Sequence, residues 1–216
     1  MSHAVMSIVV ATSIRAKLAE LRALLMKMPV DVLSAEEALG ETPNVMEDGK
    51  TFEENALKKA RAVAAASMMV TLADDSGLEV DALGGRPGVR SARFAGEGAT
   101  DAENNAELLR RMADLDDPHR RARFRCAIAL VDPWNPDGEL VVDGSCEGTI
   151  AHQPTGTGGF GYDPLFIVSG LERTMAELNE DEKTRVSHRA KALAAIQPRL
   201  EAIIKSRLDD AMRVLR

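Results

Sequence analysis

Residues 121–132 (RARFRCAIALVD) constrain the fold more than any other part of the chain. Their apolar side chains first alternate with polar ones and then become continuous, which predicts a strand at the centre of a sheet. The sequence PWNPDG follows and is typical of a turn, and residues 139–147 (ELVVDGSCE) predict an antiparallel partner strand. The chain therefore requires a sheet with an antiparallel part.

The first half of the chain predicts strands that alternate with helices, which is typical of parallel strand pairs. Thr51-Phe-Glu-Glu and Thr100-Asp-Ala-Glu are capping boxes that open helices. From about residue 180 the chain is mostly helical, with Pro198 at a kink or a helix start. Strands are predicted at 7–11, 30–33 and 68–73, and helices over 15–27, from 51 and over 100–112. We therefore expect one mixed-sheet α/β domain over residues 1–216.

Composition excludes several classes of protein. The 216 residues carry a formal net charge of −7, which opposes broad binding to nucleic acid or to an anionic membrane. The most apolar stretch, AVAAASMMVTLA, is too short to span a bilayer, and the first residues lack the features of a signal peptide. Cys126 and Cys146 predict two reduced core thiols. We therefore expect a cytoplasmic protein that binds neither nucleic acid nor membrane.

Two adjacent carboxylates, Asp74 and Asp75, follow the strand predicted at 68–73. At the carboxyl end of a strand they would point to opposite sides, so one can face a cleft while the other supports it from behind. Glu47 lies in the polar segment MEDGKTF, and such hard oxygen ligands suit Mg²⁺ or Mn²⁺, especially beside substrate phosphates. Glu53 and Glu54 begin a helix and are typical dipole partners instead.

The segment QPTGTGGFGYDP (153–164) predicts a glycine-rich loop before a strand with the sequence LFIV. It matches G-x-G-x-x-G literally, but the residues that follow are poor material for the helix that a dinucleotide site needs, and no Walker-type Lys-Ser follows. The loop carries Phe160 and Tyr162, whose rings suit stacking on a flat heterocycle. That Phe160 only pins the loop to the core is an equal alternative.

Four cationic residues stand at widely separated positions: Lys17, Lys59, Lys183 and Arg189. Each alone is typical of a solvated surface charge, so these residues form a site only if the fold brings them to one cleft. Arg189 belongs to the sequence Ser187-His188-Arg189, which is also typical of a capped helix start.

Six segments occur together in the order and with the spacing of one enzyme family. They are TFEENALKKA (51–60), ADDSGLEVDALGGRPGVRSARFAG (73–96), TDAENN (100–105), GTGGFGYDPLF (156–166), TMAEL (174–178) and SHR (187–189). On these segments nearly the whole chain resembles the inosine triphosphate pyrophosphatases, which hydrolyse non-standard purine nucleoside triphosphates. One such segment carries little weight, whereas six in order are very specific.

The resemblance implies an α/β fold with a long, twisted, mixed β-sheet and flanking helices that form two lobes around a central nucleotide cleft. It also implies a homodimeric, Mg²⁺-dependent cytosolic hydrolase, with Mn²⁺ as a substitute, that converts ITP, dITP or XTP to the monophosphate and pyrophosphate. Asp75 matches the general base and a metal ligand, and Glu47 matches a second metal ligand. Asp74 and Lys59 match further catalytic positions. The positions that match substrate contacts are Thr12, Ser13, Lys17, Ser76, Phe160, Gly161, Tyr162, Asp163, Lys183, His188 and Arg189.

One position departs from the family pattern. The first motif of the family reads roughly Thr-x-Asn-x-x-Lys, whereas this chain has Thr12-Ser13-Ile14-Arg15-Ala16-Lys17. Loss of an amide that contacts the triphosphate would cost about 1–3 kcal/mol. A weakly active or non-catalytic purine nucleotide-binding homologue is therefore the alternative hypothesis to an active pyrophosphatase. A purely structural α/β domain, the third hypothesis, does not account for six ordered motifs.

Overall fold

A computed structural model describes residues 5–26, 28–135 and 138–214 of the chain. Its strands are β1 (Met6–Val10), β2 (Val30–Ser34), β3 (Thr71–Val80), β4 (Arg121–Val131), β5 (Leu140–Ile150) and β6 (Phe166–Val168). The α-helices are α1 (Arg15–Leu25), α2 (Ala35–Leu39), α3 (Phe52–Ser67), α4 (Asp101–Arg111), α5 (Glu180–Val186) and α6 (His188–Val214). Short 3-10 turns are η1 (Asp81–Leu83), η2 (Gly88–Arg93), η3 (Asp117–His119) and η4 (Met175–Glu177). None of the described helices has the length and apolar character needed to cross a bilayer.

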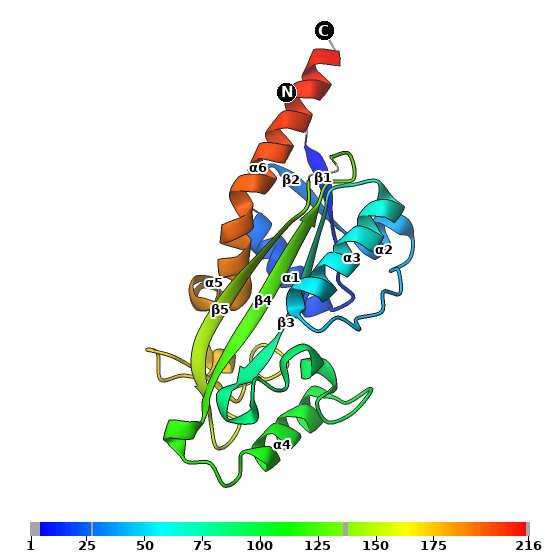
Figure 1. Cartoon of the computed structure of the whole chain (residues 1–216). Helices are drawn as coiled ribbons and strands as arrows, with labels where there is room; N and C mark the ends of the chain where they lie inside the picture. The colour runs from blue at the N-terminus through cyan, green and yellow to red at the C-terminus, as the bar shows by residue number, and fades with distance from the viewer. Residues whose placement is uncertain (1–4, 27, 136–137, 215–216) are drawn as a thin grey trace.

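The described strands form one six-stranded sheet in the order β2-β1-β3-β4-β5-β6 (Figure 1). Strand β1 pairs in parallel with β2 and β3, whereas β3, β4, β5 and β6 pair in antiparallel succession. The expected mixed sheet is confirmed, with the hairpin of β4 and β5 at its antiparallel side. Lys27, at the expected end of the first helix, and Pro136 and Asp137, in the expected turn, lie outside the described residues.

Strand β3 is longer than the sequence predicts, and this places the two aspartates differently. The expected strand ends at Ala73, whereas β3 continues to Val80, so Asp74 and Asp75 lie within it and not after it. The reason is a long-range partner, because β4 pairs with β3 along its whole length and holds it extended. The parallel neighbour β1 pairs with β3 only as far as Leu72. Asp74 and Asp75 therefore lie in the part of β3 just beyond the point where its neighbour β1 ends.

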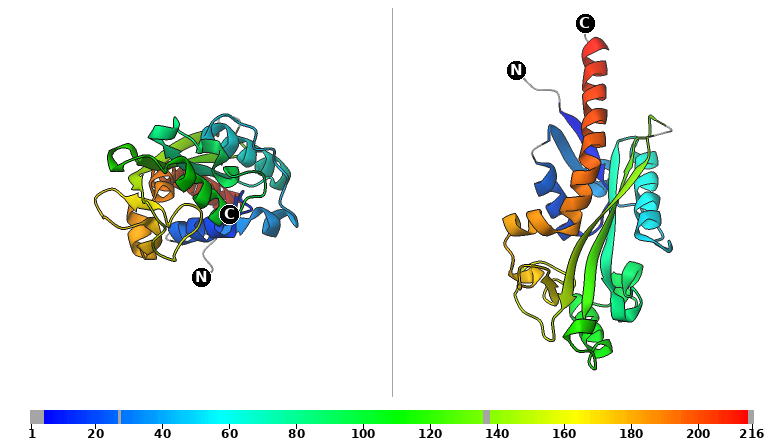
Figure 2. Two further views of the ribbon diagram at one scale, coloured as in Figure 1. Left: turned by 90° about the horizontal axis from the view of Figure 1, so that it is seen from below. Right: turned by 60° about the vertical axis from the view of Figure 1, so that its left-hand side comes forward.

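Helices cover both faces of the sheet at one end of the molecule (Figure 2). Leu72 and Ile128 face a core shared with α1 and α6, whereas Ala73 and Ala127 face α3 on the other side. On the α3 side, the small alanine side chains let the helix lie close to the strands. On the other side, each large buried aliphatic side chain contributes about 1.5–3 kcal/mol to the stability of the folded state. Helix α6 continues beyond the end of the sheet, and Pro198 lies inside it, so of the two alternatives expected there, a kink or a helix start, the helix start is wrong.

The other end of the long strands carries a second lobe. Leu78 of β3 and Phe124 of β4 pack there with α4 and with β6, through residues such as Leu108 and Phe166. The capping box expected at Thr100 is confirmed. The one expected at Thr51 is half formed, because the Glu54 carboxylate accepts from the Lys50 amide (2.7 Å) instead of closing on Thr51. Strands β3 and β4 thus run through both lobes and connect them.

Candidate active site

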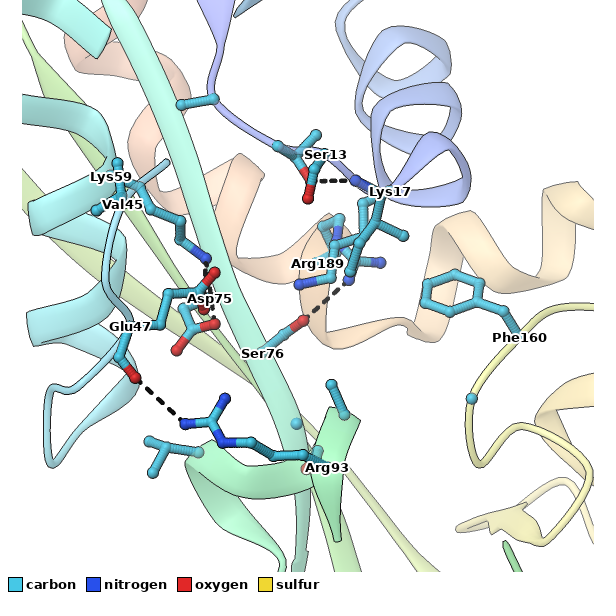
Figure 3. A pocket seen from close by; sticks show the side chains of 18 of the residues that line it. Ser13, Lys17, Val45, Glu47, Lys59, Asp75, Ser76, Arg93, Phe160 and Arg189 are labelled. Atoms are coloured by element: carbon cyan, nitrogen blue, oxygen red, sulfur yellow. Dashed lines mark hydrogen bonds and ion pairs between the residues drawn. The ribbon is translucent and has the colours of Figure 1, made fainter. Parts of the chain in front are cut away.

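A cavity of about 640 Å³ lies between the two lobes, in the size range of small-molecule sites. It opens beside β3 where β1 has ended (Figure 3). Thirteen of the residues expected in the site line it: Thr12, Ser13, Lys17, Glu47, Lys59, Asp75, Ser76, Phe160, Gly161, Tyr162, Asp163, His188 and Arg189. Two of the expected residues, Asp74 and Lys183, are not among the described residues of the lining. The fold therefore collects segments that are up to 177 positions apart in the sequence.

Asp75 faces α3 and the cavity. Its Oδ2 accepts a hydrogen bond from Asn55 Nδ2 (3.1 Å), and its Oδ1 lies 3.2 Å from Lys59 Nζ. Asn55 and Lys59 are four residues apart on α3, so both lie on the helix face that packs on the strand. Glu47 Oε2 lies 3.3 Å from the same Lys59 Nζ. Two carboxylates therefore converge on one ammonium group.

Asp74 points to the opposite side of β3, as the alternation of strand side chains requires. Its Oδ2 lies 3.0 Å from Lys17 Nζ on α1 and 3.3 Å from Arg189 Nε on α6. The Asp74 and Arg189 side chains are almost completely buried. The expected division of labour between the two aspartates, one toward the cleft and one behind it, matches this geometry.

The two aspartates differ in proton affinity. Burial raises the pKa of Asp75 above its ordinary value, although Lys59 and Lys17 act in the opposite direction. Burial also disfavours the charge on Asp74, but Lys17 and Arg189 outweigh it and hold the pKa of Asp74 well below its usual range. Burial likewise opposes the charge on Lys59, yet Asp75 and Asp74 raise its pKa. Asp75 is therefore the stronger base, and Lys59 remains a cation.

The carboxylates of the cavity are suitable ligands for a hard divalent cation whose coordination shell would be completed by substrate oxygens. Within the described ranges, no group of three His, Cys, Asp or Glu side chains is arranged to hold a metal ion. Asp75 and Glu47 supply carboxylate oxygens from two segments. Mg²⁺ is commonly held by one or two carboxylates together with substrate phosphates and water. The two carboxylates are therefore donors of the kind that Mg²⁺ takes, and the Mg²⁺ site itself stays a prediction.

The aromatic end of the cavity lies on the glycine-rich loop and on the start of α6. The Phe160 ring lines the cavity, with the Arg189 guanidinium 5.9 Å from its centre. Tyr162 is the residue that pins the loop, because its buried hydroxyl donates to the Ser91 carbonyl (2.8 Å). The His188 ring stacks on Phe124 at 5.0 Å. Burial, with the nearby Arg189 charge, holds the pKa of His188 well below its ordinary value, so the ring is neutral at pH 7.

Lys183 supports the loop from outside the cavity. Its Nζ lies 2.8 Å from Asp163 Oδ2, which also accepts from the Phe160 amide (3.1 Å). Burial raises the pKa of Asp163, and Lys183 acts in the opposite direction. Gly159 has a φ of +75° and leaves no room for a side chain, because a Cβ there would lie 1.9 Å from Asp163 Oδ2. The glycine is thus required for the loop to wrap around this ion pair.

Arg189 is held in place by three partners before any ligand binds. Its Nε contacts Asp74, its Nη2 donates to Ser76 Oγ (3.1 Å), and its Nη1 pairs with Glu20 of α1. A guanidinium has five N–H groups, so two remain for a ligand in the cavity. Ser187 caps α6 by accepting from the Ala190 amide (3.1 Å), which confirms the expected helix start.

Three residues that matter to this geometry are absent from the expected set. Asn55 could have been found from its spacing of four from Lys59 in TFEENALKKA, and Glu20 from its spacing of three from Lys17. Arg93 carries no such local signal, because its place in the cavity depends on how the second lobe folds. Ile14, the departure from the family pattern, lies at the cavity with 41% of its surface exposed.

The cavity combines a buried carboxylate of raised pKa, a second carboxylate and several cations beside a mixed α/β sheet, and this combination is that of a hydrolase. The Ham1 family model matches residues 8–199, and the chain belongs to the Ham1 family. This finding confirms the resemblance to the inosine triphosphate pyrophosphatases on which the expectations rested.

Individual relatives cover most of the chain. A dITP/XTP pyrophosphatase of Geobacter sulfurreducens is 50% identical over 193 residues, which are 89% of this chain and 96% of the relative. The structure of a HAM1 protein from Coxiella burnetii superposes with a TM-score of 0.80 at 41% identity, over 93% of this chain and 99% of that one. A nucleoside-triphosphatase (dITP/XTP pyrophosphatase) of Mycobacterium abscessus superposes with a TM-score of 0.72 at 47% identity, over 89% and 100%. The expected mixed-sheet α/β fold is thereby confirmed.

Proposed function

We propose that the protein is a nucleoside-triphosphate pyrophosphatase that hydrolyses ITP, dITP and XTP to the monophosphate and pyrophosphate. The observation that carries the proposal is Asp75, a buried carboxylate of raised pKa that lines the cavity beside Lys59 and Glu47. The relatives with this activity in their names cover nearly the whole chain, which supports the same reaction. They do not favour the alternative of a weakly active nucleotide-binding homologue.

Asp75 acts as the general base. It accepts a proton from water as the water oxygen attacks the α-phosphorus, and the bond from that phosphorus to the oxygen bridging to the β-phosphorus breaks. The bridging oxygen leaves with pyrophosphate, and the water oxygen stays on the monophosphate. A base whose pKa is raised by burial takes the proton more readily than an ordinary carboxylate, and positioned bases typically contribute about 10²–10⁴-fold.

Asp75 and Glu47 would also hold Mg²⁺, or Mn²⁺ in its place, together with substrate oxygens. When bound, such an ion neutralises the charge that develops on the phosphate oxygens. Lys59 supplies a fixed positive charge between the two carboxylates, and its raised pKa keeps it protonated. Lys17, Thr12 and Ser13 extend the polar lining toward the start of α1, where they bind the triphosphate.

The purine is bound between Phe160 and the start of α6. The ring of Phe160 stacks on the base, and the free N–H groups of Arg189 donate to the oxo group at position six of hypoxanthine or xanthine. Adenine carries an amino group there, so two donors would face each other and binding would be lost. Lys183 contributes indirectly by holding Asp163 and the backbone of the loop.

A pyrophosphate-release assay with ITP, dITP, XTP, GTP and ATP, with and without Mg²⁺, tests the proposal. We expect turnover of the first three nucleotides that depends on the metal and exceeds turnover of ATP. Equal turnover of ATP and ITP would remove the selectivity, and full activity of Asp75→Asn would remove Asp75 as the base. The family resemblance further supports a cytoplasmic homodimer of single-domain subunits, which light scattering and cell fractionation would test.

A further inference from the structure

Arg93 reaches the acidic end of the cavity from the second lobe. It ends η2, lines the cavity, and has a side chain that runs toward Glu47 and away from Phe160 (Figure 3). Its Nη2 donates to the backbone carbonyl of Glu47 (3.2 Å), so a residue of the second lobe touches the loop before α3. The guanidinium is therefore placed beside the acids that we assign to catalysis.

Among the described cations that line the cavity, Arg93 is the one without a buried or cavity-lining carboxylate as its partner. Lys17 and Arg189 are bonded to the buried carboxylate of Asp74. Lys59 lies between Asp75 and Glu47.

The carboxylate partner of Arg93 is Glu97, at 3.5 Å from its Nε, and 79% of the Glu97 side chain is exposed. Solvated pairs of this kind contribute little. The hydrogen bond of Arg93 to a neutral carbonyl leaves its positive charge available to an anion, because the carbonyl carries no net charge.

Building on the proposed function, we propose that Arg93 binds the two outer phosphates of the substrate and the pyrophosphate that is released. Phe160 marks the base end of the cavity and Asp75 the reacting phosphorus. Lys17 and Arg93 lie on different sides of Asp75 (Figure 3), so Lys17 contacts the inner phosphate and the outer phosphates extend toward Arg93. A guanidinium presents parallel donors that match phosphate oxygens in a bidentate manner. Such a cation stabilises the leaving pyrophosphate, on which negative charge develops during the reaction.

The test compares Arg93→Ala with Arg90→Ala. Arg90 is a matched control because it belongs to the same η2 turn, lies 3.7 Å from the same Glu97, and is outside the described lining of the cavity. Binding of pyrophosphate and of IMP is measured by calorimetry with Mg²⁺, and KM and kcat are measured with ITP. We expect Arg93→Ala to weaken pyrophosphate binding about ten- to a hundredfold and to leave IMP binding within twofold. Arg90→Ala should change neither.

Several outcomes overturn the inference. Equal pyrophosphate affinity in the two variants would remove Arg93 from the phosphate site. Equal loss of pyrophosphate and IMP binding in Arg93→Ala would show that Arg93 only holds the Glu47 loop in place through its hydrogen bond to the Glu47 carbonyl. Arg93→Lys, which keeps the charge, should recover part of the pyrophosphate affinity and excludes misfolding as the cause. A wild-type protein that neither turns over ITP nor binds IMP would instead refute the proposed function itself.

Discussion

Asp74 and Asp75 are the same amino acid at consecutive positions of β3, yet they lie in opposite environments. Asp74 faces α1 and α6, where Lys17 and Arg189 surround a fully buried carboxylate and lower its pKa. Asp75 faces the cavity, and its pKa is raised by burial. The comparison shows that strand alternation can place a supporting acid and a reactive acid at consecutive positions. The helices packed on each face of the sheet then set the surroundings, and so the role, of each acid.

The largest effect on activity is expected from substitution of Asp75, the aspartate that faces the cavity. Asp75→Asn should lower kcat about 10²–10⁴-fold because the variant loses the proton acceptor. Its unfolding free energy should not fall, since a carboxylate with a raised pKa in the folded state destabilises that state at neutral pH, and Asn removes the charge. Kinetics with ITP and urea unfolding at pH 7 measure the two quantities. A variant that unfolds easily would contradict the assignment of Asp75 to the reactive side.

The supporting side should respond in the opposite way. Asp74→Asn leaves Lys17 and Arg189 without the charge that compensates them, and breaking a buried pair costs about 3–5 kcal/mol. We therefore expect the unfolding free energy at pH 7 to fall by about that amount in a urea titration. An unfolding free energy equal to that of the wild type would show that Asp74 does not hold the helices to the sheet.

The same comparison predicts a pH dependence. The pKa of Asp74 is lowered in the folded protein, so its contribution to stability is complete above the unfolded pKa of about 3.9 and is lost as pH falls toward the folded pKa. The difference in unfolding free energy between wild type and Asp74→Asn should therefore narrow between pH 5 and pH 3. A constant difference over this range would place the effect outside the charge of Asp74.

Asn55 connects the reactive aspartate to the loop that carries Glu47. Its Nδ2 donates to Asp75, and its Oδ1 accepts from the Gly49 amide (2.8 Å). Loss of such orienting contacts typically costs about 10–100-fold. Asn55→Ala should therefore lower kcat/KM by about that factor and expose the Gly49 amide to hydrogen exchange.

Asn55→Asp separates the two contacts of Asn55. It restores the acceptor for the Gly49 amide but puts a second carboxylate beside Asp75 in place of a donor. We expect protection of the Gly49 amide to return without recovery of activity. If activity also recovers, the loop contact alone is what matters, and Asn55 does not position Asp75.

The limits of sequence-based prediction follow the range of the interactions involved. The opposite orientations of Asp74 and Asp75 need only the period of two in a strand, so they were predictable. That both lie inside β3 depends on pairing with β4, about fifty residues away, which no local pattern encodes. Lys183 matches a substrate contact by motif position, whereas its ion pair with Asp163 depends on the folded loop. Arg93 required the arrangement of both lobes.

The smallest effect on stability and activity is expected from substitution of Ile14, which lies where α1 begins at the cavity. Ile14 is the N-cap of α1 and has no side-chain oxygen to accept from the first turn of that helix. Ile14→Asn should add about 0.5–2 kcal/mol to the unfolding free energy through capping, and it should raise kcat/KM for ITP by about tenfold or less through an amide that contacts the triphosphate.

Ile14→Asp is the matched control for that substitution, because it caps α1 equally well but places a negative charge near the phosphates. Both variants should be stabilised, whereas only Ile14→Asn should become more active, and Ile14→Asp should lose affinity for ITP. Parallel thermal unfolding and steady-state kinetics distinguish the two effects. If both variants keep the wild-type KM, residue 14 does not contact the triphosphate, and the departure from the family motif affects only the start of α1.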